Sequence, residues 1–231
     1  LEGNDSQVVE NNPDTNYASN RQIRVDQRNN RERRAALAFN LTGIPPDALV
    51  SNAILTLTKY NGAGTLSIDV VRINSSWSEP TITWNNQPTN DSFVFNTTLT
   101  SGNADYEFNV TDLAQLWING TFQNLGMFLI PSDPGGSSVR HRFRSSDYGA
   151  NPQDRPSLNI TFFDPPPKVI DLIPAANTTF NTSEIIEIGA NVTDLGGVDT
   201  VFANVTFPNS SSFIIPLALA VGDIYNAAFT I

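Results

Sequence analysis

The sequence predicts an all-β protein: a jelly-roll β-sandwich with one short helix, followed by a truncated or incomplete Ig-like β-sandwich. Three observations support this expectation. Short runs in which apolar and polar residues alternate, as in residues 35–41, recur along most of the chain. Turn-forming Asn, Gly and Pro residues separate these runs. One segment, 112–118, instead has the apolar spacing of a helix.

The elements expected in the first part of the chain follow this alternation. Residues 1–20 are rich in turn formers and poor in apolar residues, so they predict a loop. Strands are expected at 23–26, 34–41, 54–59, 66–72, around Phe93 and Phe95, and at 106–110, 126–130, 139–145 and 158–162. Thr111 is the expected N-cap of the helix, which Asn119 and Gly120 end. About ten strands with one helix are typical of a jelly roll.

Two of the three tryptophans, Trp77 and Trp84, stand close together in the sequence. Alternation predicts a short strand here, with Ile82 and Trp84 on one face. Pro80 and Pro88 bracket this strand, because proline cannot donate to a sheet ladder. The two indoles are expected to fill the core; the alternative is that they stack on a sugar ring.

Composition divides the chain into two domains. Residues 1–163 hold a complete set of strands, and the Pro-rich run 164–167 is expected to link them to a second domain at 168–231. The second domain predicts strands at 169–173, 185–192, 198–207, 213–219 and 224–231. This number is smaller than in an Ig-like sandwich, so we expect either a truncated domain or one completed by strand exchange with a neighbour. The first residue is Leu, which predicts a removed leader or a fragment of a longer chain.

Charge and composition exclude several classes of function. The formal net charge is −10, which argues against a nucleic-acid partner. The absence of Cys excludes disulfides and thiolate metal sites, and the single histidine, His141, excludes multi-histidine zinc sites. The longest apolar run, residues 213–221, is too short for a membrane span.

The acceptor pattern for N-glycosylation, Asn-X-Ser/Thr, is over-represented. It includes 13 of the 27 asparagines, whereas chance predicts about five. The sequence therefore predicts a secreted or cell-surface glycoprotein with N-linked glycans; the alternative is that Asn and Thr are simply common in β-turns. The acceptors are Asn4, Asn40, Asn74, Asn90, Asn96, Asn109, Asn119, Asn159, Asn177, Asn181, Asn191, Asn204 and Asn209.

Eleven of the 13 basic residues are arginines, and most of them lie in two segments, 21–34 and 140–144. In the second segment Arg140, Arg142 and Arg144 share one face of the expected strand. A row of guanidinium groups could bind the carboxylates of an acidic polysaccharide in bidentate fashion. The alternatives are pairing with the chain's own Asp and Glu residues, or contact with an acidic neighbouring subunit.

Other candidate site residues are fewer. Arg34 and Trp84 are further candidates for carbohydrate contact. An oxygen-rich turn could hold a structural Ca²⁺, with Asn11, Asn12, Asp14 and Asn16 as candidate ligands; the alternative is a plain Asx-turn. No other cofactor is expected. No catalytic residue is predicted, because no carboxylate pair can be assigned and no phosphate loop or nucleophile motif is present.

Several motifs resemble one known family. They include Trp77-Ser78-Glu79, Thr81-Ile82-Thr83-Trp84-Asn85-Asn86, Phe143-Arg144-Ser145-Ser146-Asp147 and Arg155-Pro156-Ser157-Leu158. In order and spacing, residues 11–163 resemble the DNRLRE-type domain, also classed as carbohydrate-binding module family 96 and similar to the disaggregatase-related repeats of methanogen surface proteins. The resemblance implies a jelly roll, an extracellular setting and, in some relatives, polysaccharide binding. Asp147 stands where the family commonly has Glu. Residues 168–231 are similar to Ig-like repeats of archaeal surface proteins.

Two functions remain open after the sequence alone, both non-enzymatic. The first is a structural or adhesive subunit of a surface layer, sheath or extracellular filament, in contact with neighbouring copies of itself. The second is a carbohydrate-binding module that retains an acidic cell-wall or matrix polysaccharide. The density of glycan acceptors and the acidic charge favour the first function, and the family resemblance favours the second.

Overall fold

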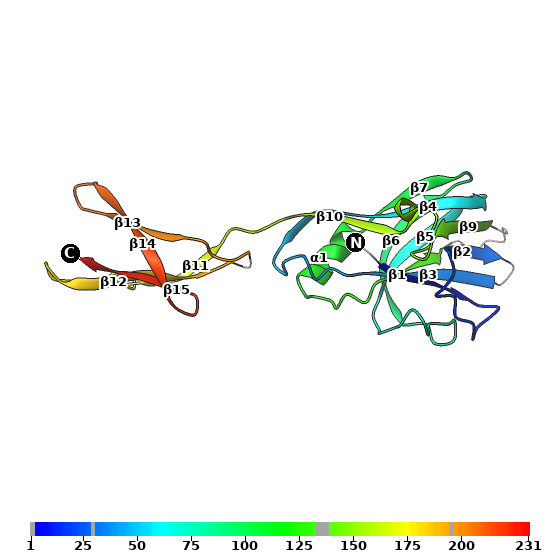
Figure 1. The fold of residues 1–231 in the computed structure, drawn as a ribbon, viewed down its shortest axis with the longest axis horizontal. Helices are drawn as coiled ribbons and strands as arrows, with labels where there is room; N and C mark the ends of the chain where they lie inside the picture. Colours follow the sequence, from blue (N-terminus) through cyan, green and yellow to red (C-terminus); the bar gives the residue numbers. More distant parts are fainter. Residues whose placement is uncertain (1–2, 29–30, 133–138, 195) are drawn as a thin grey trace. The chain divides into compact units, whose positions relative to one another are not determined.

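Antiparallel strands form most of the regular structure in the computed structural model, which describes residues 3–28, 31–132, 139–194 and 196–231 (Figure 1). The all-β expectation is therefore confirmed. The chain divides into two units, Leu1–Phe163 and Asp164–Ile231. This boundary falls at the start of the Pro-rich run 164–167.

The described part of the first unit has ten strands, one helix and a short 3₁₀ turn. The strands are β1 (Gly3–Val9), β2 (Gln22–Arg28), β3 (Arg31–Phe39), β4 (Leu49–Ala63), β5 (Leu66–Ile73), β6 (Asn90–Leu99), β7 (Ala104–Asn109), β8 (Met127–Pro131), β9 (Val139–Arg144) and β10 (Ser157–Phe163). The helix is α1 (Thr111–Ile118), and the 3₁₀ turn is Pro152–Asp154. The sheet order is β10-β4-β9-β2-β3-β8-β5-β6, with β1 paired to β3 and β7 paired to β4.

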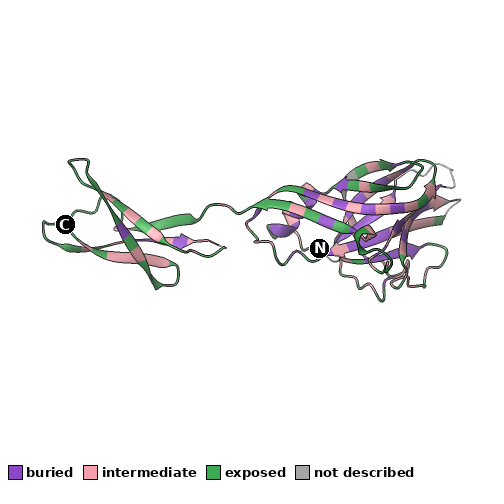
Figure 2. Cartoon of the chain, turned by 45° about the horizontal axis from the view of Figure 1, so that its top comes forward, coloured by how far each residue is buried: buried purple, intermediate pink, exposed green. Residues whose placement is uncertain are grey.

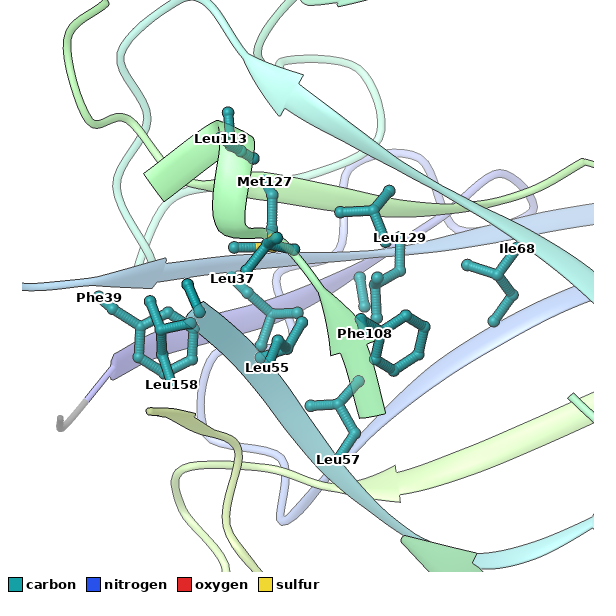
Figure 3. Packing of buried hydrophobic residues seen from close by; sticks show 14 of the residues in the cluster. Leu37, Phe39, Leu55, Leu57, Ile68, Phe108, Leu113, Met127, Leu129 and Leu158 are labelled. Carbon is teal, nitrogen blue, oxygen red and sulfur yellow. The ribbon is translucent and has the colours of Figure 1, made fainter. Parts of the chain in front are cut away.

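The main core lies inside this curled sheet. Leu37, Leu55, Phe108 and Leu129 come from four different strands, and each is 0% exposed (Figure 3). Along β4 buried residues alternate with more exposed ones, so only one side chain in two points inward, whereas β3 and β8 bury consecutive residues (Figure 2). Each such side chain stabilises the fold by roughly 1.5–3 kcal/mol through burial. Helix α1 adds Leu113 to the same cluster.

A second, smaller core lies on the opposite face of β3 and β8. Ala36 and Phe128 belong to it, whereas their neighbours along the strands belong to the main core. Ile82, Trp77 and Trp84 pack on this face from the segment between β5 and β6. Both indoles are half-buried, which agrees with the expectation that they fill core space.

The strand expected around Ile82 and Trp84 is wrong, because this segment folds as successive turns. The backbone N–H of Ile82 donates to the carbonyl of Ser78 at 2.9 Å. The side-chain oxygen of Asn86 accepts from the backbone N–H of Thr83 at 2.6 Å. Since these local hydrogen bonds pair the backbone N–H groups of Ile82 and Thr83, these groups require no partner in a neighbouring strand.

The loop expected at residues 1–20 is also wrong in part, because β1 occupies its beginning. β1 pairs with β3 from Gly3↔Phe39 to Val9↔Arg33. Its residues Asp5, Ser6 and Gln7 are buried although they are polar. The strand therefore has no apolar alternation by which the sequence could reveal it.

The helix is present where the sequence places it, but its expected cap is wrong. Thr111 is the first helical residue, and Val110 occupies the N-cap position without a side-chain cap. The hydroxyl of Thr111 instead accepts from the backbone N–H of Ala53 on β4 at 2.9 Å. This bond ties the start of the helix to the sheet.

The second unit is a five-stranded antiparallel sheet over the part of it that is described. Its strands are β11 (Lys168–Ile173), β12 (Ile185–Thr193), β13 (Val201–Thr206), β14 (Ser212–Val221) and β15 (Ile224–Thr230), in the order β11-β12-β15-β14-β13. Many large apolar side chains stay exposed here, among them Leu172 at 66%, Ile185 at 72% and Val221 at 69%. The Ig-like character of this unit stays a prediction.

Candidate functional site

Strand β9 presents alternate residues to opposite faces, as its sequence predicts. Val139, His141 and Phe143 are buried in the interior, whereas the arginines between them are half-buried. Because side chains two residues apart on a strand are roughly 6.5 Å apart, Arg142 and Arg144 form part of a row along the outer face.

A fourth arginine joins this row from β2. Arg24 lies directly opposite Arg142 in the antiparallel register of β2 and β9. On the other side of β9, Arg142 pairs with Asn61 of β4. We call Arg24, Arg140, Arg142 and Arg144 the arginine face. It is built from one face of two adjacent strands, so its side chains have a fixed backbone spacing.

Three of the four arginines of the arginine face form no ion pair with a carboxylate of the described residues. The ion pairs among the described residues join Arg33 to Asp26, Arg34 to Glu32 and Arg72 to Asp91. Arg24, Arg142 and Arg144 take part in none of these pairs. The Nε atom of each of the three is buried and has no hydrogen-bond partner within the described ranges. Internal pairing, one alternative that the sequence left open, therefore does not account for these three arginines.

The electrostatics of Arg24 show how concentrated the positive charge is. Burial lowers the pKa of Arg24, and the nearby charges of Arg142, Arg33 and Arg140 lower it further. Like charges placed directly opposite on paired strands destabilise a sheet. A bound anion would reduce this repulsion.

Aromatic rings hold one end of the arginine face. The guanidinium carbon of Arg144 lies 3.9 Å from the ring centroids of both Tyr60 and Tyr148. The hydroxyl of Tyr60 in turn donates to the side-chain oxygen of Gln22, the residue opposite Arg144 on β2. Stacking between two rings orients the planar guanidinium in advance of any ligand.

The structure brings Arg34 and Trp84 together, and the two side chains contact each other. The guanidinium carbon of Arg34 lies 5.0 Å from the centroid of Trp84. Arg34 also forms an ion pair with Glu32 at 2.6 Å and donates to Gln87 at 3.2 Å. Arg34 is thus engaged by its neighbours, unlike Arg142. Its role in carbohydrate contact stays a prediction.

Two of the four candidate calcium ligands make contacts that attach their loop to the tryptophan segment. Asp14 accepts from Asn85 at 2.7 Å, and Asn16 donates to the carbonyls of Glu79 and Ile82 at 2.8 Å each. Of the other two, Asn12 donates to a tyrosine hydroxyl, whereas Asn11 is exposed. Among the described residues, no group of three or more Asp, Glu or His side chains could hold a metal ion. Calcium at this loop stays a prediction.

The glycan acceptors are nearly all accessible. Eleven of the 13 are exposed, and the two exceptions, Asn90 and Asn191, are half-buried. Four acceptors form Asx-turns in which the side-chain oxygen accepts from the backbone N–H two residues later, at 3.0–3.1 Å. These are Asn40, Asn109, Asn119 and Asn209. Their occupancy stays a prediction.

The sequence did not reveal a carboxylate cluster around Asp5. Asp5 is 2% exposed, and one of its oxygens has no partner in the described structure. Burial raises the pKa of Asp5 to about 7, and the carboxylates of Glu79 and Asp147 raise it further. Its other oxygen accepts from the backbone N–H of Ser146 at 2.5 Å, which lowers the pKa in part. The residues of this cluster are far apart in sequence, so no local signal places them together.

Arg24, Tyr60 and Tyr148 are the site residues that the sequence did not single out. All three join the arginine face through the pairing of β9 with its neighbours or through the turn after β9. The clustering of arginines in residues 21–34 was the one available signal for Arg24.

Two further findings bear on function. No helix in the described ranges is long and apolar enough to cross a membrane. The sequence profile of carbohydrate-binding module family 96 matches residues 2–162. This match covers β1 to β10 almost completely and includes the whole arginine face. A search of curated proteins gave no match.

Proposed function

Because the chain belongs to carbohydrate-binding module family 96, we propose that its first unit binds an acidic polysaccharide through the arginine face, without cleaving it. One observation carries this proposal: Arg24, Arg142 and Arg144 have buried Nε–H groups with no partner and no carboxylate paired to them within the described structure. A polymer of uronic acids carries carboxylates at regular intervals, which can neutralise these guanidinium groups.

The arrangement suits a linear polyanion better than a single small anion. The arginines of β9 repeat along the strand, so neighbouring charged sugars can each reach a guanidinium group. The chain as a whole has a net charge of −10, so attraction to a polyanion must come from this local patch. Binding should therefore weaken as salt concentration rises.

Affinity gel electrophoresis tests this proposal with the unglycosylated protein. A gel that contains a polyuronate should retard the wild type, whereas a gel that contains a neutral glucan should not. Replacing Arg140, Arg142 and Arg144 by Ser should abolish the retardation, because the arginine face loses three of its four guanidinium groups.

A matched control removes three exposed cations outside the arginine face: Arg21, Arg31 and Lys168, each replaced by Ser. It changes the net charge equally and should keep the retardation. Unchanged mobility of the Arg140, Arg142 and Arg144 variant, or equal losses in both triple variants, would contradict the proposal.

The surface of the second unit supports an additional, structural role for the protein. We propose that it attaches the chain to neighbouring copies in a surface layer, sheath or filament, as an incomplete Ig-like sandwich that strand exchange could complete. Its support is the exposure of large apolar side chains such as Leu172 and Ile185, which is typical of protein contact surfaces. Residues 164–231 contain one basic residue, so this unit offers little to a polyanion.

Sedimentation velocity without added sugar tests the structural role. Assembly into large particles would support it, and replacing Leu172 and Ile185 by Ser should then reduce the assembly. A protein that stays monomeric at every concentration would exclude the role. The extracellular location proposed for both roles is supported by the family and by the 13 glycan acceptors.

A further inference from the structure

The glycan acceptors of the first unit are distributed unevenly over its strands. They lie on β1, β6, β7 and β10, and in the segments after β3, β5 and α1. Neither β2 nor β9 carries an acceptor, and β3, β4, β5 and β8 carry none either. The three longest intervals between consecutive acceptors in the chain are 4–40, 40–74 and 119–159. They contain β2 and β3, β4 and β5, and β8 and β9 respectively; of these strands, β2 and β9 form the arginine face and β4 borders it.

The separation of glycan acceptors from arginines is visible along a single strand, β4. Near its beginning, Ile54 pairs with Asn109 of β7 on one side and with Asn159 of β10 on the other. Both asparagines are exposed acceptors. Near its end, β4 pairs with β9, where Asn61 lies opposite Arg142. One end of this strand is thus bordered by acceptors and the other by arginines.

The border of the arginine face contains an asparagine, Asn61, that is not a glycan acceptor. Asn61 is exposed and lies in the sequence Asn61-Gly62-Ala63, which differs from an acceptor only at Ala63. The segments 5–39 and 120–158 contain eight further asparagines, and none of them begins an Asn-X-Ser/Thr acceptor. Two acceptors elsewhere, Asn40 and Asn119, have their side-chain oxygen fixed by a backbone N–H, which leaves the nitrogen for the sugar.

We propose that N-glycans cover the first unit except at the arginine face, and that this bare surface is where the polyanion binds. The inference rests on the proposed function, since it assigns the glycan pattern to that same site. A glycan is bulky and needs solvent, so one attached beside Arg142 would exclude a polymer from the row. Glycans on the remaining surface leave the row open while they shield the other faces.

Two forms of the protein test this inference, one from a host that glycosylates Asn-X-Ser/Thr and one from a host that does not. Peptide mass spectrometry should find glycans at the acceptors of the first unit. Both forms of the wild type should bind a polyuronate with the same Kd in isothermal titration calorimetry. Ala63→Thr creates an acceptor at Asn61; its glycosylated form should lose binding, whereas its unglycosylated form should bind as the wild type does.

Ala63→Val is the matched control, because valine has the shape of threonine but creates no acceptor. It should bind in both forms. Binding by the unglycosylated wild type together with no binding by its glycosylated form would overturn the inference while the proposed function stands. Bare acceptors throughout the first unit, or undiminished binding by Ala63→Thr carrying a glycan at Asn61, would overturn it as well. Failure of the unglycosylated wild type to bind would instead overturn the proposed function, and the inference with it.

Discussion

Asp5→Asn is expected to stabilise the first unit above pH 7, by on the order of 4 kcal/mol. Asp5 is 2% exposed, and burial raises the pKa of its carboxyl group to about 7, compared with 3.8 as its ordinary value. At pH 8 the folded protein must therefore hold a buried negative charge close to Glu79 and Asp147. Asparagine is neutral at every pH, and its side-chain oxygen can still accept from Ser146.

The expected pH dependence follows from the direction of this shift. Because the folded protein binds this proton more tightly than the unfolded chain, the contribution of Asp5 to stability is largest below pH 4. It decreases as pH rises towards about 7 and then stays constant. Wild type and Asp5→Asn should thus have similar stability at pH 4 and differ most at pH 8.

Urea unfolding of the unglycosylated protein between pH 4 and pH 8 measures this difference. Tryptophan fluorescence reports on the first unit alone, since all three tryptophans lie in it. Asp147→Asn is the control, because it removes a nearby but exposed carboxylate and should change stability little. A variant Asp5→Asn that is less stable than the wild type at pH 8 would show that the buried charge is favourable, contrary to this account.

The double change Arg24→Gln with Arg142→Gln is expected to lower the affinity for a polyuronate by at least about 100-fold, since each hydrogen bond to a charged group is worth about 1.5–3 kcal/mol. The same change should leave the free energy of unfolding unchanged or raise it, because it removes two like charges that lie directly opposite each other. Loss of binding without loss of stability separates a binding role from a structural one.

The corresponding lysine variant tests the geometry of the site as well as its charge. Arg24→Lys with Arg142→Lys keeps both charges but loses the Nε–H groups and the planar fork. Its affinity should fall between the wild type and the glutamine variant. The pair Arg21→Gln and Arg31→Gln, two exposed arginines outside the arginine face, is the control for net charge. Calorimetry that finds the glutamine variant equal to this control would show that the ligand binds elsewhere.

The sequence predicted those parts of the candidate site that depend on one strand. Alternation in residues 139–145 placed Arg140, Arg142 and Arg144 on one face, and the structure confirms this. It could not place Arg24 opposite Arg142, because the register of strands far apart in sequence is fixed by the packing of the whole sheet. A cluster of arginines is equally compatible with internal ion pairs, and three-dimensional structure is needed to exclude them.

The errors in the predicted fold share one physical cause. Alternation reveals a strand only if its inward residues are apolar, and β1 instead buries Asp5 and Gln7. Conversely, the apolar spacing of Ile82 and Trp84 imitates a strand, although these side chains cover a second core from a series of turns. The sequence pattern reports the burial of side chains, and burial also occurs without regular backbone pairing.

NMR of the arginine side chains tests the central claim most directly. Each arginine gives a separate Nε–H signal, which single Arg→Lys variants assign, and a polyuronate oligomer is titrated into the unglycosylated protein. The signals of Arg24, Arg142 and Arg144 should shift together with a single Kd, because their Nε–H groups have no partner in the described structure. The ion-paired Arg33 and Arg72 should not shift. Shifts confined to these ion-paired arginines, or the absence of any shift while the oligomer binds, would contradict the assignment of the arginine face as the binding site.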